Sequence, residues 1–298
     1  MAGGFDRRRF LAGTLATPLA AAFAAPAGLA QAAGGQRLAV LDWALLECLL
    51  ALGTVPVAAV ELVLFRKLAV EPTVPPQVID LGLRGSFNLE LLASLRPDAI
   101  YVSPFNSWAM PLIEPIAPLR FYEIFGTQTP PFEQAITVTR QMGDALGRAA
   151  EAQSYIADTK AELEAARQAL AGRASRPVYL INLGDARHAR VFGPDSLFGS
   201  IMAAMGLQNA FSGPTRYAAS APVGIEAMAE RPDAAIVIVG PIPPDAEAAL
   251  EHSVLWQAIP AVASGRAHIL PNMNAFGALP TARRFIRLLS ASLGAQAA

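Results

Sequence analysis

Two distant stretches of the chain follow the same order of residues. Leu92–Pro104 reads LASLRPDAIYVSP, and Met228–Pro241 reads MAERPDAAIVIVGP. In both, a helix-forming run stops at Arg-Pro, because the residue before a proline avoids helical geometry. The apolar run that follows does not alternate with polar residues, which is typical of a parallel strand covered on both faces. The repeat predicts one helix-to-strand step in each of two α/β lobes, and a single larger sheet with two similar crossovers is the alternative.

The segment between the two copies favours separate lobes. From Arg148 to Leu170 the chain has no proline or glycine, mixes acidic with basic residues and has few apolar ones. A helix of about 23 residues is about 35 Å long, and one with so little apolar surface suits a bridge between two bodies. We therefore expect an α/β fold of two Rossmann-like lobes joined by one long α-helix. The expected boundaries are an N-terminal lobe over 33–147, a connecting helix over 148–171 and a C-terminal lobe over 172–298.

The first 32 residues have the composition of an export signal. Three arginines precede Phe10-Leu11, an alanine-rich apolar run continues to about Leu29, and Ala30-Gln31-Ala32 provides small residues for cleavage. This order predicts a secretory signal, and the paired arginines indicate the twin-arginine pathway. A membrane anchor is the alternative, but two prolines interrupt the run before it reaches the roughly 20 residues that a span needs. Without a lipobox cysteine, the mature protein is expected to be free in the periplasm of a Gram-negative bacterium.

Composition excludes several classes of function. Charged residues make up 16% of the chain and the net charge is −1, so the basic patch that nucleic acid requires is not expected. Cys48, the single cysteine, lies in an apolar helical pattern and is predicted to be buried in the core. The three histidines are scattered rather than spaced as metal ligands, so no metal site is expected.

A ligand cleft is expected where the strands of the two lobes end. In open α/β sheets, ligands bind beyond the carboxyl ends of the strands. The loops there contain aromatic residues and arginines, which suit a planar ligand rich in oxygen. Those side chains are Arg84, Phe105, Trp108, Arg187, Arg216 and Tyr217.

An exported hydrolase is the alternative from a different class. No Gly-x-Ser-x-Gly elbow is present. Ser103 follows a predicted strand, but Pro104 removes a backbone N–H that an oxyanion hole could use. His188 could act as a base, although a histidine in such a segment more often forms hydrogen bonds within a turn. We therefore expect no enzymatic activity and no catalytic residues.

Five motifs occur in this order along the chain: Arg37–Trp43 with Glu47, Val78–Arg84, Asn88–Leu92, Val191–Phe198 and Leu255–Pro260. Together they resemble those of the periplasmic ferric-hydroxamate (ferrichrome-type) siderophore-binding proteins of iron ABC importers. The resemblance covers essentially the whole mature chain and implies two lobes around a rigid helix, the helical-backbone class of periplasmic binding proteins. It implies capture of a ferric siderophore and delivery to an inner-membrane ABC permease dimer. The iron would be held by the chelator, with no protein-bound cofactor, and the protein would act as a monomer.

The resemblance also implies which residues bind the ligand. In that family the arginine of the Gly-Leu-Arg loop, here Arg84, contacts the iron-chelating oxygens, and an aromatic residue near Phe105 or Trp108 lines the cleft. Related proteins have tryptophans where this chain has Leu68, Ala218 and Asn274, so carboxylate or catecholate siderophores, haem and cobalamin stay open as ligands. Trp43 and Trp256 are expected to be packing residues. The predicted ligand-binding set is Arg84, Phe65, Phe105, Trp108, Arg216, Tyr217 and Asn274.

Two glutamates occupy matching positions before the two copies of the repeat. Glu90 and Glu226 are each the second residue of a predicted helix. Acids in a first helical turn favour the helix macrodipole by about 0.3–1 kcal/mol, which explains either residue alone but not their shared position. Related binding proteins use one such glutamate per lobe against permease arginines. We therefore expect Glu90 and Glu226 to dock the protein on its permease.

Overall fold

The computed structural model describes residues 35–171, 176–213, 215 and 222–294. The predicted signal peptide over 1–32 lies outside the described residues, and so do Arg216, Tyr217 and Ala218. Within the described ranges, no helix combines the length and the apolar character needed to cross a bilayer.

The first lobe is built on a parallel sheet in the strand order β3-β2-β1-β4-β5. Its central strands are fully buried, as the continuous apolar runs predict for a sheet with helices on both faces. The repeat's first strand is confirmed as β4. The strands are β1 (Leu38–Val40), β2 (Ala58–Ala59), β3 (Ile79–Asp80), β4 (Ala99–Val102) and β5 (Leu119–Phe121).

Short helices connect these strands, and side-chain caps begin several of them. Asp42 accepts a hydrogen bond from Leu45 N at the start of α1, and Asn88 accepts one from Leu91 N at the start of α3. Asn88 is therefore the N-cap of α3. The helices are α1 (Trp43–Ala51), α2 (Leu62–Leu68), α3 (Leu89–Ser94), the 3₁₀ helix η1 (Pro104–Ala109), α4 (Met110–Ile113) and α5 (Pro131–Ala145).

The second lobe has a mixed sheet in the order β10-β9-β6-β7-β8. Strands β10, β9 and β6 are parallel, whereas β7 runs antiparallel to both β6 and β8. The expected similarity between the lobes therefore extends to the parallel strands and not to β7, because the turn after β6 is too short for a crossover and forms a hairpin. The strands are β6 (Val178–Leu183), β7 (His188–Val191), β8 (Val223–Gly224), β9 (Ala235–Gly240) and β10 (Ala267–Asn272).

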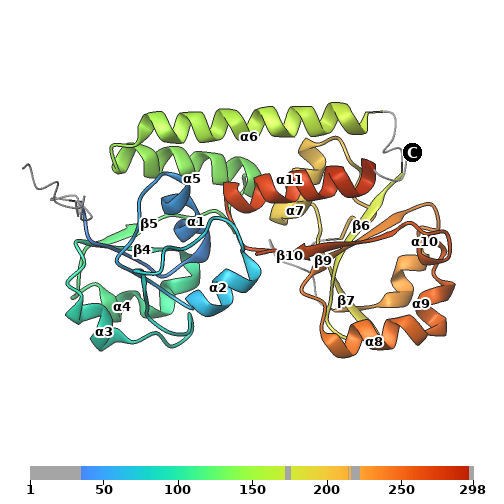
Figure 1. Cartoon of the computed structure of the whole chain (residues 1–298), viewed down its shortest axis with the longest axis horizontal. Helices are drawn as coiled ribbons and strands as arrows, with labels where there is room; N and C mark the ends of the chain where they lie inside the picture. Colours follow the sequence, from blue (N-terminus) through green and yellow to red (C-terminus); the bar gives the residue numbers. More distant parts are fainter. Residues whose placement is uncertain (1–34, 172–175, 214, 216–221, 295–298) are drawn as a thin grey trace, which may run out of the picture. The chain divides into compact units, whose positions relative to one another are not determined.

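The helices of the second lobe lie around this sheet (Figure 1). The helix expected before Arg231-Pro232 in the second copy of the repeat is a 3₁₀ helix, whereas its counterpart α3 in the first copy is an α-helix. The elements are α7 (Leu197–Ala204), η2 (Ile225–Ala229), α8 (Pro244–His252), α9 (Val254–Ala258), α10 (Pro260–Ala263) and α11 (Leu279–Gly294).

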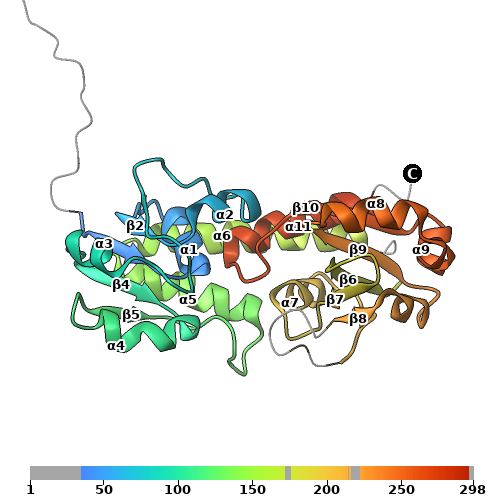
Figure 2. The ribbon, with the colours of Figure 1, turned by 90° about the horizontal axis from the view of Figure 1, so that it is seen from below.

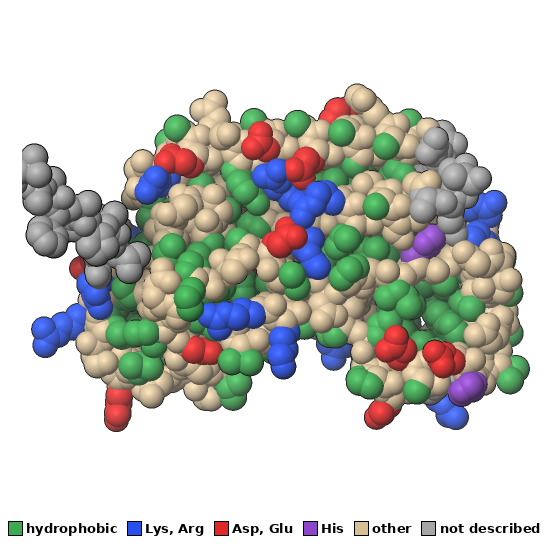
Figure 3. Space-filling model, viewed as in Figure 1, with side chains coloured by type: hydrophobic (Ala, Val, Ile, Leu, Met, Phe, Trp, Pro, Cys, Tyr) green, Lys and Arg blue, Asp and Glu red, His purple; other side chains and the backbone are tan. Residues whose placement is uncertain are grey.

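The predicted long helix is α6 (Ala149–Leu170), which runs above both lobes in Figure 1. One side of it packs on α5 and α11, and acidic side chains lie along its outer side in Figure 3. Helix α11 returns to the first lobe and contacts α1 and α5 as well as α7. The lobes are therefore joined by α6, as predicted, and α11 adds packing from the second lobe onto the first, so that one buried cluster continues from the first sheet to α7 and α11.

Two further side-chain contacts link segments that are distant in the sequence, one at Cys48 and one at Asn272. Cys48 is buried, with its sulfur 3.6 Å from Thr139 Oγ1, as its apolar setting predicts. At the end of β10, the Asn272 side chain donates a hydrogen bond of 3.2 Å to the carbonyl of Lys67 in α2. Seen from below, the segment after β10 lies between the two lobes (Figure 2).

Candidate ligand-binding site

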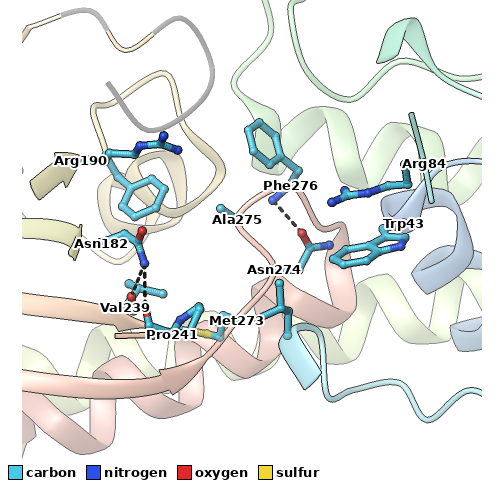
Figure 4. A pocket seen from close by; sticks show the side chains of 13 residues that line it. Trp43, Arg84, Asn182, Arg190, Val239, Pro241, Met273, Asn274, Ala275 and Phe276 are labelled. Carbon is cyan, nitrogen blue, oxygen red and sulfur yellow. Dashed lines mark hydrogen bonds between the residues drawn. The ribbon is translucent and has the colours of Figure 1, made fainter. Parts of the chain in front are cut away.

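Two adjacent cavities lie at the carboxyl ends of the strands, where the outline of the molecule is notched between the lobes (Figure 3). The first has a volume of about 210 Å³ and is lined from both lobes. The second has a volume of about 250 Å³ and is lined mainly by the first lobe. Trp43, Arg84 and Phe276 line both, so the two cavities form one continuous cleft, part of which is shown in Figure 4.

Arg84 lies in this cleft in a held position. Its guanidinium carbon is 3.9 Å from the centre of the Trp43 ring, and its Nε donates to Glu61 Oε2 at 2.5 Å. The side chain is still 42% exposed, because the Trp43 ring covers only one face of the planar guanidinium and Glu61 pairs with its Nε. The guanidinium can therefore donate further hydrogen bonds to an oxygen-rich ligand without changing its orientation.

Phe65, predicted from resemblance to bind the ligand, lies in the core of the first lobe in this structure. Its side chain is 1% exposed and lines neither cavity. It lies on the buried side of α2, where it meets the Trp43 ring edge to face at a centroid distance of 5.4 Å. Trp43 packs as predicted, being 3% exposed with its Nε1 donating to Val60 O at 3.1 Å, and it also lines both cavities.

The predicted aromatic residues Phe105 and Trp108 both line the second cavity. They project from η1, whose first turn is capped by Ser103, and their side chains are 46% and 50% exposed. Phe105 contacts the ring of Phe276 edge to face at 5.5 Å. The structure therefore brings these two residues to the same surface as Arg84, with Phe276 as a contribution from the second half of the chain.

Asn274 reaches the first cavity, but its amide already has partners. The side chain is 4% exposed. Its Nδ2 donates to Glu47 Oε1 at 2.9 Å, and its Oδ1 accepts from Phe276 N at 3.1 Å, as Figure 4 shows for the second bond. Asn274 therefore shapes the loop that carries Phe276 rather than offering a free amide to a ligand. Leu68 also lines this cavity.

Glu47, which the sequence analysis did not assign to the site, fixes this loop from beneath. It is fully buried on α1. Besides Asn274, its carboxylate accepts hydrogen bonds from Ala278 N at 2.8 Å, Thr281 N at 3.3 Å and Thr281 Oγ1 at 2.9 Å. Burial raises the pKa of Glu47 to about 7, although these donors favour the charged form. One carboxylate of the first half thus anchors the start of α11 and the cleft loop before it.

The wall that faces Arg84 comes from the second sheet and was also not predicted. Asn182 and Arg190 are register partners on β6 and β7, and Phe192 follows on the same side of the chain because strand side chains alternate. All three line the first cavity. Asn182 Nδ2 donates to Val239 O at 2.9 Å and to Pro241 O at 3.3 Å, which fixes this wall to the end of β9 (Figure 4). Arg187, expected in the cleft, lines neither cavity.

Ser103 and His188, which were considered as catalytic groups of a hydrolase, have hydrogen-bond partners within the fold instead. Ser103 Oγ donates to the buried Asp42 Oδ2 at 2.7 Å and caps η1, and burial raises the pKa of Asp42. His188 is exposed at the start of β7, with its Nδ1 2.9 Å from Asp185 Oδ2 in the preceding turn. In the part of the chain that the structure describes, no group of three or more histidine, cysteine or acidic side chains could hold a metal ion.

The two glutamates expected to dock the permease are both exposed. Glu90 is the second residue of α3 and Glu226 the second residue of η2. Each lies on a different lobe, in the first turn of a short helix that precedes a copy of the repeat.

Comparisons with known proteins agree with this architecture. Residues 38–273 match the family model described as periplasmic binding protein. The chain is 32% identical over 292 residues to the iron(3+)-hydroxamate-binding protein FhuD of Escherichia coli, covering 98% of each protein. Among solved structures, the Fe³⁺–Desferal-bound siderophore-binding protein FhuD of Vibrio cholerae matches with a TM-score of 0.82 and 25% identity, covering 87% of this chain and 98% of that one.

More distant structures share the fold alone. The triscatecholate siderophore-binding protein FeuA of Bacillus subtilis matches with a TM-score of 0.69 and 16% identity, over 87% of this chain and 92% of that one. The chain thus has two α/β lobes, a helix across both and a cleft at the strand ends. It also matches the family model over most of its sequence. The chain belongs to the periplasmic binding protein family.

Proposed function

We propose that this protein captures a ferric siderophore of the hydroxamate type and delivers it to an ABC importer of the inner membrane. The observation that carries the proposal is the exposed guanidinium of Arg84, held on Trp43 in a cleft with aromatic walls. Planar guanidinium donors suit the negatively charged oxygens of a hydroxamate chelate. The Escherichia coli relative, an iron(3+)-hydroxamate-binding protein, and the Vibrio cholerae relative, a siderophore-binding protein with Fe³⁺–Desferal bound, support the same ligand class.

The iron would be held by its chelator, and the protein would bind the complex without chemical change. Membership of a binding-protein family supports this reading. We further propose that the protein works as a monomer in the periplasm and reaches it by the twin-arginine pathway, with residues 1–32 removed. Its functional divisions would be the N-terminal lobe over 33–147, the connecting helix over 148–171 and the C-terminal lobe over 172–298, with α11 packing back on the first lobe.

Delivery would use Glu90 and Glu226 as docking residues. Both are exposed, one lies on each lobe, and the repeat places them equivalently. An ABC permease with two-fold symmetry offers the same basic pocket twice, so a matched pair of carboxylates suits it.

The binding proposal can be tested by titrating the exported protein with a ferric trihydroxamate, a ferric triscatecholate, haem and cobalamin while following tryptophan fluorescence. The hydroxamate should quench with the lowest Kd and should be recovered unchanged. Trp256→Phe is the matched control, because Trp256 is 7% exposed and lines a different cavity, so quenching should persist in that variant. Tighter binding of haem or cobalamin, or catalytic release of a hydrolysed siderophore, would overturn the proposal.

A further inference from the structure

We propose that Arg190 forms an anion subsite, so that the preferred ligand is a ferric hydroxamate with a pendant carboxylate group. The inference rests on the proposed function and narrows its ligand class. It follows from the unequal charge balance of the two walls of the cleft.

The position of Arg190 is fixed by the β6–β7 hairpin. It pairs with Asn182 across the two strands, and directly opposite residues of an antiparallel pair project from the same face of the sheet. Asn182 is itself bonded to the backbone of Val239 and Pro241. Arg190 is exposed and lines the first cavity, opposite the wall formed by Trp43 and Arg84 (Figure 4).

The two guanidiniums of the cleft differ in their charge environment. Arg84 is paired with Glu61 at 2.5 Å, and the buried Asp42 lies near enough to interact with it electrostatically. Over the described ranges of the chain, none of the ion pairs involves Arg190. The first-lobe wall is therefore close to neutral, whereas the second-lobe wall carries an unbalanced positive charge.

The charge of a simple ferric trihydroxamate suits the first-lobe wall but not the second-lobe wall. Fe³⁺ and three singly charged hydroxamates give a neutral complex, which suits the arginine that Glu61 already balances. The complex leaves Arg190 without an acidic partner inside a cleft where bound ligand excludes water, and interactions between charges become stronger there. A carboxylate on the periphery of the ligand would accept two hydrogen bonds from the guanidinium fork.

Three ferric complexes with the same chelating core test the subsite. Fe³⁺–Desferal has a free terminal amine, its N-acetyl derivative is neutral there, and its N-succinyl derivative carries a carboxylate. Titrations in low salt should rank the succinyl complex above the acetyl complex and the amine last, with about ten-fold between the extremes, the effect of one charge-assisted hydrogen bond. High salt should reduce the ratio because it screens exposed charges.

Arg190→Gln should reduce that ratio to below about two-fold, because glutamine has no charge that attracts the carboxylate or repels the amine. The loss of a ten-fold preference corresponds to about 1.4 kcal/mol. Arg187→Gln is the matched control, because it removes the same charge from the same hairpin but from a residue that lines neither cavity. It should keep the parental ratio. Equal Kd values for all three complexes in the parent, or an unchanged ratio in Arg190→Gln, would overturn the subsite while leaving the siderophore function intact. Failure of all three complexes to bind would instead overturn the proposed function.

Discussion

The guanidinium of Arg84 lies over the Trp43 ring, with 3.9 Å between the guanidinium carbon and the ring centre. Phe65 supports the same ring from the core, edge to face, and Glu61 holds the arginine from the side. The arginine is thus ordered before a ligand arrives. Binding then costs less conformational entropy than it would for a freely rotating side chain.

Replacing Arg84 should weaken binding directly. Arg84→Ala removes charge-assisted hydrogen bonds, each worth about 1.5–3 kcal/mol, so the Kd for a ferric hydroxamate should rise by about ten- to a hundred-fold. Arg84→Lys should recover part of the affinity, because lysine keeps the charge but not the planar donors. Arg66→Ala, on the exposed side of α2, is the control in fluorescence titrations, and equal Kd values for Arg84→Ala and the parent would contradict the assignment.

Phe65 should affect stability far more than affinity. Phe65→Ala opens a cavity in the core beneath Trp43 and should lower the free energy of unfolding by about 3–5 kcal/mol in denaturant melts. Phe65→Leu keeps much of the volume, so its folded form should bind ligand with a Kd within a few-fold of the parent's. A large loss of affinity in Phe65→Leu with normal stability would restore Phe65 as a ligand contact.

Glu47 should make stability depend on pH. Its folded pKa is raised from 4.5 to about 7, so between these values the folded state binds more protons than the unfolded state. The free energy of unfolding therefore falls as pH rises through this window, by up to about 3 kcal/mol from this group.

Comparison with Glu47→Gln isolates that contribution. The stability of the parent relative to the variant should be greatest near pH 4.5 and should decrease towards pH 7.5, as measured by urea melts at several pH values. Glu133→Gln on the exposed side of α5 should show no such trend. A parent-to-variant difference that is constant with pH would mean that Glu47 keeps an ordinary pKa in the folded protein.

Substitution of Glu90 and Glu226 should abolish transport while it leaves ligand binding unchanged. In Glu90→Ala with Glu226→Ala, the Kd for the ferric siderophore and the melting temperature should stay near parental values, because both residues are exposed and outside the cleft. Uptake of ⁵⁵Fe-siderophore into cells should collapse. Uptake at the parental rate, with normal export of the double variant, would remove the docking role.

The elements that the sequence predicted well depend on local signals. Strand β4 lies in the apolar run that follows Arg-Pro in the first copy of the repeat, Asn88 caps the helix before it, and α6 covers almost all of the proline-free and glycine-free segment. Each of these follows from nearby residues: a proline that stops a helix, a side chain that bonds the first turn, and a long run without helix breakers. Two α/β lobes bridged by a helix were therefore foreseeable without coordinates.

The mixed second sheet and the return of α11 were not foreseeable in the same way. The direction of β7 depends on the turn after β6, and the docking of α11 depends on Glu47, more than 200 residues earlier in the chain. No local pattern records such a pairing, because the donors and the carboxylate meet only after both lobes have formed.

Loops at strand ends and a family motif were enough to place Arg84, Phe105 and Trp108 at the cleft. Only the folded chain shows that Trp43 lines the cleft while Phe65 supports it, and that Arg190 lies opposite Arg84. Which face of an aromatic residue or strand is exposed depends on what the rest of the chain packs over it, and that burial is a property of the folded molecule rather than of the residue.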